Sequence, residues 1–213
     1  MANEPSSGRA IARAGRNPLL DVQTHLRVER LLTEIGPIDW CAVALSNPYA
    51  SVLRSDRAAM NDARRDLAAI PSEATLDRIS AVVEAALSQL PDKAPTAAAV
   101  AVLFDTMPRQ PANPATYLNA LCFDLVELGF QPAVVAAACQ ELRRTATFVP
   151  VISELIAACR TVQERYVSLQ RLTAHAREAR ARLKTAIIEA EREPPPKPKR
   201  RPQPDAESGE AEW

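Results

Sequence analysis

The side chains that most often do chemistry in proteins, histidine and cysteine, are few and scattered in this chain. The two histidines, His25 and His175, have no cysteine or carboxylate at the spacing that a metal site needs. The four cysteines include no CxxC pair: Cys41, Cys122, Cys139 and Cys159. We therefore expect both histidines to be solvated surface residues. The cysteines in Ala-rich apolar stretches are expected to be reduced thiols that pack as small core residues.

Other signatures of catalysis are missing from the sequence as well. It contains no GxSxG, no GxGxxG and no Walker-type GKS or GKT, and its 5 glycines are too few for a phosphate-binding loop. Asp124 and Glu127 stand three residues apart, as a pair of acid–base carboxylates could. Apolar residues flank them in an amphipathic pattern, so a solvated helix face is the better interpretation. We expect no enzyme, no cofactor and no metal.

Basic residues gather in the last third of the chain. Arg177, Arg180 and Lys184 would form one stripe on a helix, and a second cluster follows in the tail: Lys197, Lys199, Arg200 and Arg201. These residues could follow a phosphate backbone without reading its sequence, because no aromatic side chains interleave with them. A merely solubilising tail explains the second cluster equally well.

The sequence ends in DAESGEAEW, which places Trp213 after acidic residues. Such a segment could dock in a basic groove with an apolar floor. The alternative, which we favour, is that Trp213 has no role in binding.

The elements that would carry these residues are helices. Hydrophobic residues make up 47% of the chain and aromatic residues only 4%, so alanine and leucine dominate, and glycine is too scarce for a β-rich fold. Apolar stripes and proline positions predict helices over 19–35, 47–70, 73–90, 96–107, 114–128, 132–144 and 150–193.

Several helix ends carry recognisable signals. Pro71-Ser72 should break and recap the chain, and Asn113-Pro114 should start a helix that ends at a C′ glycine, Gly129. Asn47-Pro48 and Thr96 are the predicted starts of two others.

The last predicted helix carries apolar or small residues at alternating steps of three and four, the heptad pattern of a coiled coil. This seam consists of Ile152, Leu155, Cys159, Val162, Tyr166, Leu169, Thr173, Ala176, Arg180, Leu183, Ile187 and Ala190. Either the last part of this seam binds a partner, or the second half of the helix is simply solvated. The first interpretation predicts a homo-oligomer or a protein partner bound through a set of residues that includes the terminal tryptophan: Tyr166, Leu169, Leu183, Ile187 and Trp213.

Three phrases between Val100 and Arg160 form a composite pattern: VAVLFDTMP, YLNALCFDLVELGFQPAVVAAACQELRR and FVPVISELIAACR. They resemble the small helical domain of phage replicative-helicase loaders and inhibitors. The matching residues are Leu103, Phe104, Pro108, Tyr117, Leu118, Pro132, Val135, Phe148, Pro150, Glu154 and Leu155.

The resemblance covers about sixty residues and implies a helical domain that binds a replicative helicase. The N-terminal third has no counterpart in that family, and the helicase-contacting residues of the family have no one-to-one matches here. Within the pattern, Phe148 and Leu155 are expected to anchor the last helix onto the domain.

The sequence thus predicts an all-α protein: a single multi-helix bundle domain over 19–165, a long projecting C-terminal helix over 166–193, and disordered ends over 1–18 and 194–213. No apolar run reaches the length of a membrane span and the leading segment has no signal-peptide pattern, so we expect a cytoplasmic protein. The expected function is a phage- or prophage-type DNA replication accessory that binds a partner near DNA. The alternative is a structural or scaffolding protein that oligomerises through its C-terminal helix.

Overall fold

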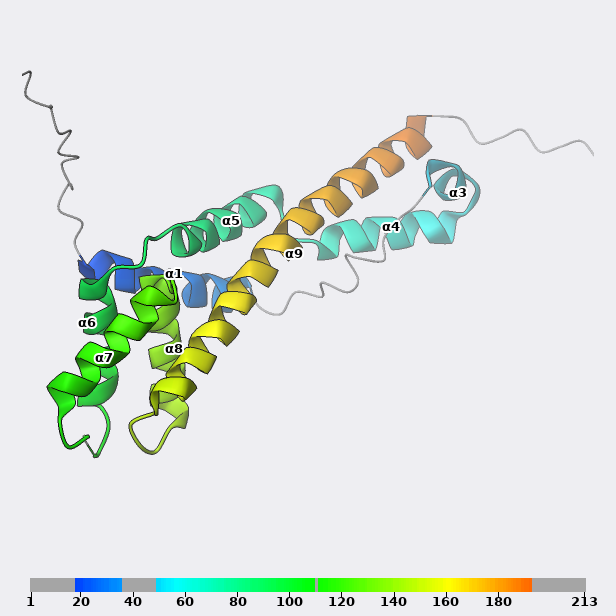
Figure 1. Cartoon of the computed structure of the whole chain (residues 1–213). Helices are drawn as coiled ribbons and strands as arrows, with labels where there is room; N and C mark the ends of the chain where they lie inside the picture. The colour runs from blue at the N-terminus through cyan, green and yellow to red at the C-terminus, as the bar shows by residue number, and fades with distance from the viewer. Residues whose placement is uncertain (1–17, 36–48, 110, 193–213) are drawn as a thin grey trace, which may run out of the picture. The chain divides into compact units, whose positions relative to one another are not determined.

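The computed structural model describes residues 18–35, 49–109 and 111–192, with side chains described from Gln23 onward. Every regular element in these residues is a helix, which confirms the all-α prediction (Figure 1). The helices are α1 (Pro18–Ile35), α3 (Ala50–Ser55), α4 (Arg57–Ala69), α5 (Glu73–Leu87), α6 (Lys93–Asp105), α7 (Pro114–Glu127), α8 (Pro132–Thr145) and α9 (Ile152–Arg192).

Local capping chemistry sets three helix ends as predicted. The Ser72 side chain accepts a hydrogen bond from the Thr75 amide at the start of α5, and Asn113 accepts one from Thr116 at the start of α7. Gly129 takes a φ of +80° after α7, the left-handed conformation that a C′ glycine adopts without strain. These helix boundaries therefore follow from short sequence signals.

One predicted helix start and one predicted continuous helix are corrected. Asp56, with φ −128° and ψ 109°, separates α3 from α4, and its carboxylate caps the amide of Ala58. Asp92, not Thr96, caps α6 by accepting from Ala94, which leaves Thr96 inside the helix and fully buried. An aspartate one residue before a helix satisfies amides that would otherwise lack acceptors, so each aspartate defines a start. The Asn47-Pro48 pair lies outside the described residues.

The chain forms two compact units, which differ from the predicted division at residues 165 and 193. The first unit comprises Met1–Trp40 with Pro71–Arg177, and the second comprises Cys41–Ile70 with Glu178–Trp213. The long helix α9 belongs to the first unit up to Arg177 and to the second unit beyond it.

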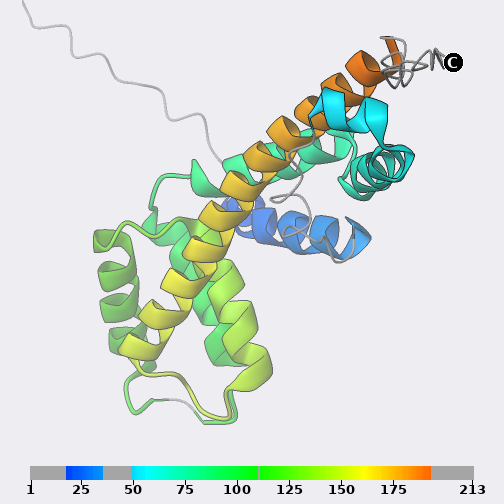
Figure 2. The same cartoon turned by 90° about the vertical axis from the view of Figure 1, so that its right-hand side faces the viewer.

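In the first unit, α8 is the central helix. It contacts α1, α5 and α6, and every residue from Pro132 to Cys139 is buried. Four of those residues are alanines, whose small side chains let the neighbouring helices approach closely. Helices α6, α7 and α8 lie side by side, and the connections α6–α7 and α8–α9 lie at the same end of the unit (Figure 1, Figure 2).

A buried glutamine joins three parts of the first unit. Gln89 follows α5, is 6% exposed, and donates through Nε2 to the Thr24 hydroxyl of α1 at 3.1 Å. Its Oε1 accepts from the Ala133 amide of α8 at 2.9 Å. Because the N-cap Gln131 provides no side-chain acceptor, Gln89 satisfies one of the amides that the start of α8 leaves without a partner.

The second unit is small and combines α3 and α4 with the last part of α9. Its buried residues include Leu53, Ala63 and Ile70 from the earlier helices, and from α9 they include Ala179, Leu183, Ala186, Ile187 and Ala190. An ion pair of 2.7 Å between Arg64 of α4 and Glu191 of α9 adds a polar contact at the surface. The end of α9 is therefore covered by this chain.

Candidate functional site

The residues predicted to bind nucleic acid serve in part to hold the fold together. Arg177 pairs with Asp77 of α5 at 2.7 Å within the first unit. Arg180 donates through Nη1 to the carbonyls of Leu67 at 3.1 Å and Ile70 at 3.0 Å. Only Lys184 of the helical stripe is exposed without a pairing among the described residues. The tail cluster of Lys197, Lys199, Arg200 and Arg201 lies outside the described residues.

The contact of Arg180 with α4 has a clear physical role. The last carbonyls of a helix lack intrahelical donors, and a cation near that end also interacts favourably with the helix dipole.

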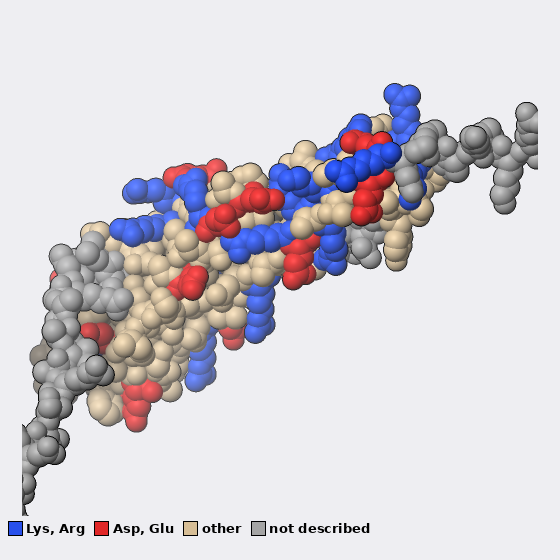
Figure 3. All heavy atoms as spheres, turned by 90° about the horizontal axis from the view of Figure 1, so that it is seen from above, with Lys and Arg blue, Asp and Glu red and all other residues tan. Residues whose placement is uncertain are grey.

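On the face seen in Figure 3, acidic and basic side chains interleave. This mixture is what a solvated surface with internal ion pairs produces, and it is not the uninterrupted basic band that tracks a phosphate backbone.

Replacing Arg180 by methionine is expected to lower the free energy of unfolding by about 1–3 kcal/mol, because the carbonyls of Leu67 in α4 and of its C-cap residue Ile70 lose a donor. The matched control is Lys184→Met on the same helix, which should leave the free energy of unfolding within about 0.5 kcal/mol of the wild type. Urea denaturation followed by circular dichroism measures both. Equal stability of the two variants would mean that Arg180 has no capping role.

The residues predicted to bind a partner through the seam lie inside the chain. Tyr166 is 0% exposed, and Leu169, Leu183 and Ile187 are 8%, 1% and 7% exposed. Both earlier interpretations of the end of the helix need correction, because it neither offers an apolar seam nor stands alone in solvent. It packs within the second unit. Trp213 lies outside the described residues.

The histidine prediction is also corrected in part. His25 is 5% exposed and lines a hollow of about 70 Å³ with residues of α6 and α8, because those helices cover that side of α1. His175 is partly exposed. Cys122, Cys139 and Cys159 are buried free thiols, as predicted, and Cys41 lies outside the described residues. Within the described part of the chain, no group of three or more histidine, cysteine, aspartate or glutamate side chains could hold a metal ion.

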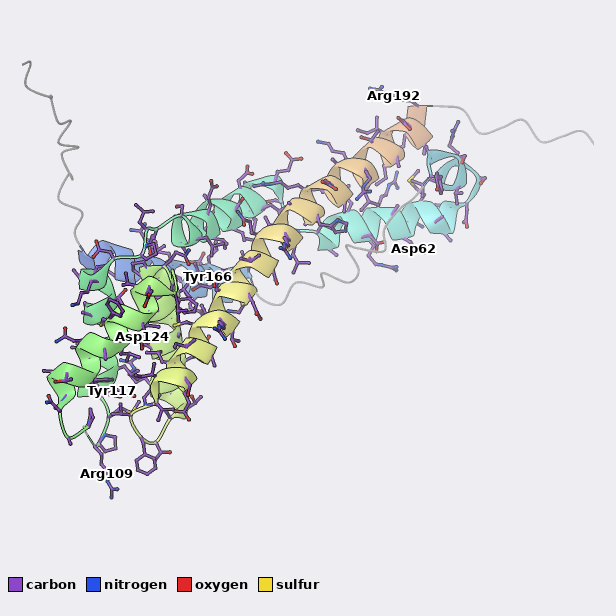
Figure 4. The ribbon with its side chains drawn as sticks, viewed as in Figure 1. Asp62, Arg109, Tyr117, Asp124, Tyr166 and Arg192 are labelled. Carbon is purple, nitrogen blue, oxygen red and sulfur yellow. The ribbon has the colours of Figure 1, made fainter. Side chains whose placement is uncertain are left out.

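The two connections at one end of the first unit form a built surface. We name residues 106–109 and 146–151 the tip. The Tyr117 hydroxyl of α7 donates to the Pro150 carbonyl at 3.0 Å, and its ring stacks on Phe104 of α6 with centroids 5.8 Å apart. Figure 4 shows Arg109 at this end and Tyr117 beside it at the start of α7. These contacts join the first turns of α7 to α6 and to the α8–α9 connection.

Phe148 is the main exception to the predicted core. It was expected to anchor α9, but it is 58% exposed, whereas Leu155 is 0% exposed and anchors the helix as predicted. The guanidinium carbon of Arg109 lies 5.8 Å from the centroid of the Phe148 ring, a cation–π contact between the two connections. Val151 beside it is 54% exposed. The tip thus exposes apolar side chains, and the contacts of Arg109 with Phe148 and of Tyr117 with Pro150 hold its backbone in place.

Two further arginines stand next to the tip in the sequence. Arg143 and Arg144 occupy the last turn of α8, where a cation is favourable to the helix dipole, and both are exposed. Neither they nor Arg109 forms an ion pair with another described residue. The sequence does not reveal this surface, because a phenylalanine two residues before a helix-starting proline usually packs onto that helix.

The chain matches no model of a known protein family, no curated protein and no solved structure. Among the helices of the described residues, none combines the length and apolar content needed to cross a membrane.

Proposed function

We propose that this chain is a non-enzymatic accessory protein that binds a protein partner through the tip. The proposed partner is a replicative helicase, because the sequence resembles the helical domain of phage replicative-helicase loaders and inhibitors. The observation that carries the proposal is the exposure of Phe148 with Arg109 over its ring. Aromatic and arginine side chains dominate the binding energy of protein interfaces, and an exposed aromatic ring gains most from being covered.

The residues of the resemblance give the proposal its second support. Most of them are structural: Leu103, Phe104 and Leu155 are buried. Tyr117 and Pro150 are joined by the hydrogen bond between α7 and the α8–α9 connection. The resembling residues that remain exposed at the tip are Pro108 and Phe148. The pattern is thus consistent with a scaffold whose exposed members meet a partner.

The scaffolding alternative gains no support from the packing of α9, because its seam is buried within this chain. In this proposal, helicase loading brings the chain close to DNA. Arg177 and Arg180 are engaged in contacts within their own units, so DNA contact would depend on Lys184 and the basic tail.

The proposal is tested by titrating a hexameric bacterial replicative helicase with the full chain and measuring complex formation by light scattering. Phe148→Ser is expected to weaken the complex about 30-fold or more, the effect of losing an interface hot spot of about 2 kcal/mol. Tyr49→Ser is the matched control, since Tyr49 is an aromatic residue of the second unit with 69% exposure. The control should bind within about two-fold of the wild type.

Absence of a complex with the wild-type chain would contradict the choice of partner. A complex that forms equally well with the Phe148 variant would contradict the tip as the contact surface. Adding single-stranded DNA to the same titration separates proximity to DNA from binding to the helicase.

A further inference from the structure

A second apolar surface lies between the start of α6 and the end of α7, in the first unit. An open hollow of about 190 Å³ is lined by Lys93, Cys122, Phe123, Val126 and Glu127. Cys122 is 1% exposed and forms its floor, while Phe123 is 63% exposed at its edge. A cavity of about 150 Å³ in a protein interior holds a benzene ring, so this hollow has room for one large apolar side chain.

Further apolar residues stand next to the hollow in the sequence. Leu90, three residues before Lys93, is 76% exposed, and Leu128, directly after Glu127, is 49% exposed. Single exposed apolar side chains are ordinary on a protein surface, and Leu90 and Leu128 flank the lining residues only in the sequence. The apolar side chains that line the hollow itself are those of Cys122, Phe123 and Val126, and an exposed apolar hollow of this kind is typical of a binding surface.

The two charges at the rim oppose the helices that carry them. Lys93 is the first residue of α6, where the helix dipole is positive, and Glu127 is the last residue of α7, where it is negative. Neither forms an ion pair with another described residue. Lys93 lies close enough to Cys122 for its charge to oppose the rise that burial causes in the pKa of that thiol. Stability of the isolated helices therefore does not explain these two residues.

We propose that the hollow receives one apolar side chain from an amphipathic helix of a partner protein. That helix would bring a carboxylate to Lys93 and a cation to Glu127. On a helix, residues three and four positions from the apolar side chain lie on the same face, so charges one turn to either side can meet the two rim residues. A nucleic acid fits this rim less well, because Glu127 repels phosphate.

This surface is distinct from the tip and does not depend on the proposed helicase partner. Tyr117, whose hydroxyl contacts Pro150 of the tip, lies near the start of α7, and Glu127 ends the helix ten residues later, about 15 Å along its axis. Asp124 lies farther from the tip along α7 than Tyr117 does (Figure 4). A variant at the hollow can therefore be tested without disturbing Phe148.

The test uses the full chain and labelled synthetic helical peptides that differ only in two charges around a central phenylalanine. The mixed peptide carries one glutamate and one lysine, and the others carry two glutamates or two lysines. Fluorescence anisotropy should show that the wild type binds the mixed peptide about three- to five-fold more tightly than either other peptide, as one exposed ion pair predicts.

Variants at the rim make the charge preference decisive. Lys93→Glu leaves two acidic rim residues and should shift the preference to the peptide with two lysines, and Glu127→Lys should shift it to the peptide with two glutamates. Phe123→Ser should weaken all three peptides. Val102→Ser is the control, because Val102 of α6 is 52% exposed but does not line this hollow.

Charge preferences that follow the rim variants support the proposal, whether or not the helicase binds the tip. The proposal is overturned if no peptide binds saturably or if the preference ignores the rim charges. It is also overturned if labelled oligothymidylate binds instead and Lys93→Glu abolishes that binding, which would assign the hollow to nucleic acid.

Discussion

Leu155→Ala is expected to lower the free energy of unfolding by about 2–5 kcal/mol, because it removes a fully buried side chain and leaves a cavity. Phe148→Ala, seven residues earlier, should lower it by no more than about 1 kcal/mol. The Phe148 ring is 58% exposed, so its contact with Arg109 is the main interaction that the truncation removes.

Urea denaturation of the two variants and the wild type, followed by circular dichroism, gives both values. The pair is informative because the sequence pattern treats the two residues alike. Equal losses would show that Phe148 is buried in solution and that the tip has no exposed aromatic ring. A small loss for both would place the start of α9 away from the core.

Alkaline pH is expected to destabilise the first unit through its buried acids. Burial raises the pKa of the Cys159 thiol from 9.0 to about 12 and that of Tyr166 from 10.0 to about 12. Between pH 9 and about 12 the thiol of Cys159 has lost its proton in the unfolded chain but keeps it in the folded chain, and the same holds for Tyr166 between pH 10 and about 12. The free energy of unfolding therefore falls as pH rises, by about 1.4 kcal/mol per pH unit for each such group.

The contribution of Cys159 is present in full below pH 9 and is lost progressively as pH rises toward 12. Urea denaturation at intervals from pH 8 to 11 measures the slope. Cys159→Ala is the control: it lowers stability at every pH through its cavity, but it should make the slope above pH 9 shallower. An unchanged slope in that variant would show that this thiol is not protected from ionisation by burial.

The sequence predicted what local interactions decide. Ser72, Asn113 and Gly129 set helix ends through contacts within a few residues, and these ends are where they were expected. Asp92 is an equally local signal, but Thr96 nearby drew the predicted start of α6 to the wrong residue. Asp56 interrupts a segment whose apolar stripe predicted one continuous helix. Competing caps at a spacing of a few residues are hard to rank from sequence.

Burial set by distant helices was harder to predict. His25 is buried because α6 and α8 cover its side of α1, whereas no described helix covers the Phe148 ring, which is 58% exposed. The seam of α9 was identified correctly as apolar, but nothing in its heptad pattern says that α3 and α4 of the same chain complete the second unit. The tip and the hollow are surfaces of the assembled helices, so neither was predicted.

The division of the second unit between two distant segments has a consequence for the order of folding. Arg180 contacts Leu67 across 113 residues and Arg64 contacts Glu191 across 127, so these contacts close very long loops. The residues between them include α5 to α8, and their collapse into the first unit would shorten the loop that remains to be closed. During synthesis, α3 and α4 leave the ribosome long before the end of α9 and must wait for it. We therefore expect the second unit to acquire protection from hydrogen exchange last, after the first unit has formed.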